Sequence, residues 1–97
     1  MHESKTPVLV TTEHRGVFFG LYLDERDQGR TVVLAKCQNC LHWGRTVKGF
    51  LGLAANGPDT SCRIGPTVPK TTLYGVTSIS ECSDKAVQAW EGQPWSA

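Results

Sequence analysis

The sequence predicts one α+β domain over residues 1–97, built as a small curled antiparallel β-sheet or partly open barrel with one or two short helices, the last one C-terminal. β-Branched and aromatic runs separated by charged or glycine-containing turns predict the strands. Two later segments with apolar residues at helical spacing predict the helices. The sequence contains no internal repeat that would indicate a second unit.

The first half is predicted to be strands. Residues 8–12 (VLVTT) follow Pro7, which suits the first position of a strand. In residues 17–24, Val17 and Phe19 alternate with Phe18 and Tyr22, so both faces carry apolar side chains. This pattern predicts a strand buried on both sides, or one that bends at Gly20. Residues 31–37 (TVVLAKC) predict the returning strand of an antiparallel hairpin.

In the second half of the chain, the spacing of apolar residues changes from the alternation of a strand to the period of a helix. Apolar residues at i, i+3, i+4 and i+7 predict a short helix over 47–54, capped by Thr46 and ended by Asn56-Gly57-Pro58. A short strand is expected at 62–64, and a longer one over 71–82 with a bulge at Gly75. Ser83 is expected to be the N-cap of a C-terminal helix that ends at Gly92 and buries Trp90.

Composition favours a cytoplasmic protein. The first residues, MHESKTP, include no apolar stretch of the signal-peptide type, and no apolar run approaches the ~20 residues that cross a bilayer. We therefore expect no membrane association, and four cysteines that are thiols or metal ligands rather than disulfides.

Charge is unevenly distributed along the chain. Residues 28–70 contain six basic side chains against Asp59 alone, whereas residues 1–27 contain three basic and five acidic ones. If the basic middle forms one surface, it suits an acidic partner, either protein or nucleic acid. Folding can equally scatter these charges, and the sequence leaves both outcomes open.

The Cys37–Cys40 pair is a weak metal signal. A structural zinc site needs four ligands, usually from two closely spaced pairs, and Cys62 and Cys82 are isolated in the sequence. A redox pair would be expected at a helix start, whereas here a strand leads into the motif. We therefore predict no metal ligands, with Cys37 and Cys40 as the weak alternative, and expect these cysteines to pack as small apolar side chains.

The motifs do not indicate an enzyme. No nucleophile elbow, phosphate-binding loop or dinucleotide fingerprint occurs, and no Cys–His pair is marked by its spacing. We predict no catalytic residues and no cofactor. Binding remains open, because a tryptophan among cations is a combination that single-strand binders use. The candidate binding residues are Lys36, His42, Trp43, Arg45, Lys48 and Arg63.

Several runs together carry a family resemblance: VLVTTEHRGVFFG, GRTVVL, NCLHW, KGFLGLAANGP, SCRIGP, TLYGVTSISEC and AVQAWE. From residue 7 to 95 the chain resembles a family of small uncharacterised proteins of bacteriophages, prophages and other mobile elements. The resemblance implies no enzymatic activity. It also leads us to expect residues other than cysteine at positions 37 and 62, so a Cys37–Cys40 metal site would not be a property of the family.

What the resemblance implies is an accessory protein that binds and blocks a host protein complex, for example a nucleic-acid-handling defence complex, in the manner of an anti-CRISPR inhibitor. The first alternative is a small nucleic-acid-binding β-domain that uses the basic middle and Trp43. The second is a zinc-stapled structural module. Partner identity, oligomeric state and the roles of Trp43 and Trp95 stay open at this point.

Overall fold

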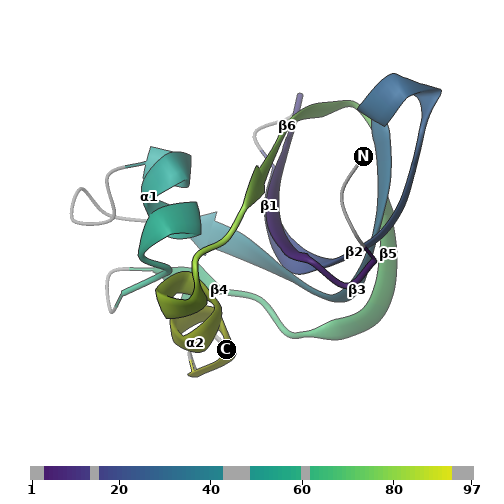
Figure 1. The fold of residues 1–97 in the computed structure, drawn as a ribbon. Helices are drawn as coiled ribbons and strands as arrows, with labels where there is room; N and C mark the ends of the chain where they lie inside the picture. The colour runs from purple at the N-terminus through teal and green to yellow at the C-terminus, as the bar shows by residue number, and fades with distance from the viewer. Residues whose placement is uncertain (1–3, 14–15, 43–48, 60–61, 93–97) are drawn as a thin grey trace.

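The protein is an α+β domain, as the sequence predicts. A computed structural model describes residues 4–13, 16–42, 49–59 and 62–92. Six strands and two α-helices occur among these residues (Figure 1). The strands are β1 (Pro7–Thr12), β2 (Val17–Arg26), β3 (Thr31–His42), β4 (Arg63–Ile64), β5 (Val68–Leu73) and β6 (Val76–Glu81), and the helices are α1 (Gly49–Ala55) and α2 (Asp84–Gly92).

The strands form one curled antiparallel sheet that is not closed. Its order is β4-β3-β2-β1-β6, and β5 pairs with β3 beside β4. The predicted strand over 71–82 is instead two strands, β5 and β6, separated by Tyr74 and Gly75. Gly75 has φ +66°, a conformation that glycine adopts without strain. Because β5 pairs with β3 and β6 with β1, this one turn connects opposite ends of the sheet and gives the partly open barrel of Figure 1.

Both faces of the sheet are buried, which confirms the expectation for β2. The inner face holds what we call the barrel core: Val8, Val10, Tyr22, Val32, Leu34, Cys37 and Leu73. The outer face packs against the helices in what we call the helix-side core: Leu9, Val17, Phe19, Cys40, Leu53, Ala54, Ile64, Ala86 and Trp90. Alternation along β1 and β2 therefore divides the apolar residues between two cores.

The bend at Gly20 is confirmed, and it has a partner in β3. Leu21 pairs with Ala35 and Phe19 with Gln38, so two residues of β3 lie opposite Gly20 alone. This is a β-bulge, which bends a strand and re-aims a side chain. A Cβ on Gly20 would lie 3.0 Å from both the Ala35 carbonyl oxygen and Leu34 Cβ. Glycine is thus required by the close approach of the two strands.

The predicted helices are present. Ser83 caps α2 as expected, because its Oγ accepts a hydrogen bond of 3.1 Å from the Ala86 backbone N–H. Gly57 follows α1 with φ +81°, and a Cβ there would lie 2.5 Å from Ala89 Cβ on α2. The predicted cap of the first helix, Thr46, lies outside the described residues. Within the part of the chain that the structure describes, neither helix has the length and apolar character needed to span a membrane.

Candidate binding cleft

The structure places two of the six candidate binding residues completely. Lys36 lies at the bulge of β3, and Arg63 lies in β4, where it pairs with His42 at the end of β3. His42 lies six residue steps after Lys36 along β3, which corresponds to about 20 Å of strand. Lys36 and Arg63 therefore do not form one compact site. The side chain of His42 and all of Trp43, Arg45 and Lys48 lie outside the described part of the chain.

The two cysteines of the CxxC motif are buried on opposite sides of the sheet. Cys37 is 3% exposed and belongs to the barrel core, whereas Cys40 is 6% exposed and belongs to the helix-side core. Both pack as the sequence predicts, and β3 between them prevents them from ligating one metal ion. Among the described residues, no three His, Cys, Asp or Glu side chains gather as metal ligands.

The other two thiols, Cys62 and Cys82, are both partly buried against the helix-side core. Cys62 lies near Asp59, with 3.9 Å between its Sγ and Asp59 Oδ1. Cys82 is partly buried against the helix-side core, and this burial raises the pKa of its thiol to about 12. Burial also raises the pKa of Cys37, although a hydrogen bond with the Thr71 side chain opposes the effect. Raised values keep Cys37 and Cys82 as neutral thiols, which are poor nucleophiles.

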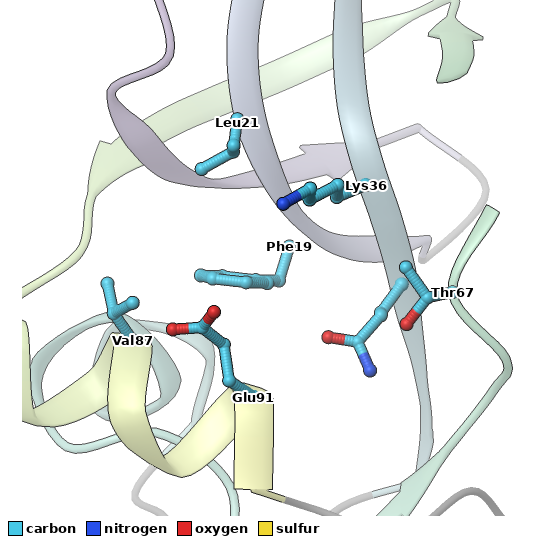
Figure 2. A pocket seen from close by; sticks show the side chains of 7 residues that line it. Phe19, Leu21, Lys36, Thr67, Val87 and Glu91 are labelled. Carbon is cyan, nitrogen blue, oxygen red and sulfur yellow. The ribbon is translucent and has the colours of Figure 1, made fainter. Parts of the chain in front are cut away.

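A cleft of about 310 Å³ lies between the outer face of the sheet and α2 (Figure 2). It is of the size that small-molecule sites have at their lower end. Its lining comes from four parts of the fold that are distant in sequence: β2, β3, the β4–β5 connection and α2. The lining residues are Phe19, Leu21, Lys36, Gln38, Thr67, Val87 and Glu91.

The apolar part of the cleft is held rigid by the helix-side core. The Phe19 ring is stacked on Trp90, with 5.0 Å between the ring centroids and 4° between the planes. Trp90 is completely buried, and its Nε1–H donates a hydrogen bond of 3.3 Å to the Leu53 carbonyl oxygen of α1. One side chain thus fixes α1, α2 and the aromatic floor of the cleft relative to one another.

The bulge in β3 brings a cation to this apolar floor. Lys36 has φ +50°, in the left-handed region that non-glycine residues seldom occupy. Such a conformation costs of the order of 1 kcal/mol and often occurs at functional sites. Here it places Lys36 in the cleft lining, and Figure 2 shows the Lys36 side chain coming from the sheet and the Glu91 side chain from α2.

Gln38 is the most deeply buried polar group of the cleft. It is 6% exposed, and its side-chain amide makes no hydrogen bond to another residue of the described ranges. No fully enclosed side-chain nitrogen or oxygen lacks a partner in these ranges. The amide of Gln38 must therefore meet the open space of the cleft, where it can donate and accept hydrogen bonds.

Sequence reasoning identified Lys36 but missed the rest of the cleft. Alternation and helical spacing place Phe19, Leu21 and Val87 on the apolar faces of β2 and α2, but this pattern does not reveal that they border an open space. Gln38 carried the only local signal, since it is a polar residue between two buried cysteines in a strand. Glu91 approaches the sheet only because α2 packs there, and nothing local to residues 84–92 indicates that contact.

One comparison with known proteins gives a family. Residues 5–90 match the model of a domain of unknown function, DUF6948. This match covers most of the chain. The protein belongs to the DUF6948 family. No curated protein matches the sequence significantly.

Proposed function

We propose that this DUF6948 protein is a non-enzymatic accessory protein of a bacteriophage or mobile element. It acts in the bacterial cytoplasm by binding an acidic surface of a host protein complex. Inhibition of a defence complex, in the anti-CRISPR manner, is the specific form of this proposal. The observation that supports it is the character of three neighbouring strands, β3, β4 and β5, which we call the basic strands.

The basic strands contain cations and no carboxylate. Their residues, 31–42, 63–64 and 68–73, include Lys36, Arg63 and Lys70 and no Asp or Glu. All three cations are exposed. The carboxylates of the β2–β3 turn are engaged locally instead: Asp24 lies 3.8 Å from the Arg26 side chain, and Asp27 accepts a hydrogen bond from Thr31. One part of the sheet therefore presents positive charge that no acid in the same strands offsets.

Exposed apolar side chains on the same strands favour a protein partner. Leu41 on β3 is 56% exposed and Val68 on β5 is 39% exposed. Apolar contacts among cations are typical of the buried centres of protein interfaces, where arginine is enriched. Such side chains add little to a contact with phosphates.

The test is capture from a nuclease-treated bacterial lysate with paired charge variants. Arg63→Glu/Lys70→Glu reverses two charges on the basic strands, and Lys5→Glu/Lys85→Glu reverses two charges elsewhere. We expect the wild type and the Lys5/Lys85 variant to retain one complex in stoichiometric amount, and the Arg63/Lys70 variant to lose it. The retained complex is then reconstituted from purified parts and assayed for inhibition. Equal capture by all three chains, or a complex that keeps full activity, contradicts the proposal.

Direct nucleic-acid binding is a second candidate, supported by the same absence of acids from the basic strands. It predicts that a labelled oligonucleotide binds in fluorescence anisotropy without any host protein. The affinity should then fall steeply between 50 mM and 200 mM salt, with a logarithmic slope of about −0.7 to −0.9 per neutralised phosphate. The absence of binding at 50 mM salt would eliminate this candidate.

A further inference from the structure

We propose that the cleft between the sheet and α2 is a binding site for a free α-amino acid with an apolar side chain. The inference is independent of the proposed host partner. It rests on three features of the cleft: an apolar floor, two opposite charges that form no ion pair within the described residues, and an amide that faces the open space.

The floor suits an apolar side chain of moderate size. Phe19 and Leu21 from β2 and Val87 from α2 supply its apolar surface. Because Phe19 is already stacked on Trp90, its position does not have to be fixed when a ligand binds. Preorganisation of this kind lowers the entropic cost of binding.

The two charges suit the ends of a zwitterion. Lys36 from β3 and Glu91 from α2 both line the cleft, and neither makes an ion pair with another residue in the described ranges. An α-carboxylate can pair with the Lys36 ammonium while the α-ammonium group pairs with Glu91. A ligand with only one of these groups leaves one protein charge without a partner, so both groups contribute to selection.

Gln38 supplies the buried polar contact. Gln38 lines the cleft and is 6% exposed as a residue, and its amide has no hydrogen-bond partner among the described residues. Because no fully enclosed side-chain nitrogen or oxygen lacks a partner in these ranges, the amide is open to the cleft, where a ligand can bond to it in place of solvent. The NH₂ group of Gln38 can donate to an α-carboxylate, and the Thr67 hydroxyl at the rim can donate or accept.

The strained bulge at Lys36 in β3 has a role in the proposed site. The left-handed conformation of Lys36 and the missing Cβ of Gly20 together place an ammonium group beside an aromatic floor. Without the extra residue of the bulge, β3 would alternate regularly. Every later side chain of the strand would then point to the opposite face of the sheet. The bulge thus contributes to the cleft, because it positions the Lys36 ammonium group there.

The test is a titration of ¹⁵N-labelled protein with L-leucine, L-methionine, L-phenylalanine and L-glutamate, followed by amide chemical shifts. We expect saturable shifts for at least one apolar amino acid, confined to β2, β3, the β4–β5 connection and α2. N-acetyl-L-leucine and L-leucinamide each lack one charge. Each should bind about tenfold more weakly or worse, as expected for the loss of a charge-assisted hydrogen bond.

Variants sharpen the same experiment. Lys36→Gln and Glu91→Gln should each weaken binding by about tenfold or more, whereas Lys70→Gln, which removes a cation outside the cleft, should not. Two results overturn the proposal. One is the absence of saturable shifts at ligand concentrations up to about 10 mM, at which a site with a Kd of about 1 mM would be about nine-tenths occupied. The other is equal binding of N-acetyl-L-leucinamide, which has no charge. Because both are measured on the wild type, the test stands even if a variant unfolds.

Discussion

The barrel core and the helix-side core are built on opposite faces of the same strands, yet they differ in what encloses them. The barrel core consists of strand residues alone, and the curl of the sheet surrounds it. The helix-side core needs α1 and α2 as a second layer, and its central stack is Phe19 on Trp90. α2 covers the outer face incompletely, which leaves the cleft at its margin. The barrel core therefore contributes to stability alone, whereas the helix-side core both stabilises the fold and borders the cleft.

The largest expected effect is on the free energy of unfolding when either core loses a large side chain. Trp90→Ala should lower the free energy of unfolding by about 3–5 kcal/mol, since it empties a completely buried aromatic site. Leu34→Ala in the barrel core should cost about 2–5 kcal/mol. Denaturant titration followed by circular dichroism measures both.

The two variants should differ at the cleft. Trp90→Ala removes the support of the Phe19 ring and should weaken ligand binding in the folded fraction, whereas Leu34→Ala should leave binding unchanged. Trp90→Phe, which keeps an aromatic ring, provides a folded version if the alanine variant does not fold. Equal binding losses in the Leu34 and Trp90 variants would show that the cores are not independent.

A second prediction concerns the contact between the helices. Gly57→Ala should lower the free energy of unfolding by about 1–3 kcal/mol, because the new methyl group would lie 2.5 Å from Ala89 Cβ and the residue keeps φ +81°. Gly92→Ala is the matched control, since nothing lies within 4 Å of its Cβ position. Similar melting temperatures for the two variants would contradict this account of α1–α2 packing.

A third, smaller effect is expected at the start of α2. Ser83→Ala removes the hydrogen bond from the Ala86 N–H and should cost about 1 kcal/mol. Ser83→Asp keeps an acceptor and should recover most of this loss, as measured by thermal denaturation. Failure of Asp to restore stability would mean that the second hydrogen bond, from Ser83 Oγ to the Ala55 carbonyl oxygen, matters more than the cap.

The last effect is zero at neutral pH and develops only in alkali. In the unfolded chain Cys82 loses its proton near the ordinary pKa of 9.0, whereas burial holds the folded pKa at about 12. Between these values the unfolded state binds fewer protons, so stability falls as pH rises from 9 towards 12 and is fully retained below 9. The melting temperature of Cys82→Ala should decline less over this window than that of the wild type. Parallel declines would contradict the assignment.

Most of the barrel could be predicted from sequence because its signals are local. Alternation in 17–24, the turn before Thr31 and the Ser83 cap each depend on neighbouring residues, and the structure confirms them. The division of residues 71–82 between two ends of the sheet could not be predicted, since Gly75 fits a bulge and a turn equally well. The cleft could not be predicted either. Lys36 reaches it through an unusual φ, and Glu91 reaches it through the packing of a helix more than 50 positions later in the chain.

The turn at Tyr74–Gly75 also has a consequence for synthesis of the protein. β1 pairs with β2 soon after both leave the ribosome, but its other edge must wait for β6, where Val8 pairs with Glu81. Throughout that interval the nascent chain presents an unpaired edge with apolar residues beside it, which is a template for association with other chains. The rate at which residues 13–81 are translated should therefore influence the yield of native protein more than the translation rate of the other residues.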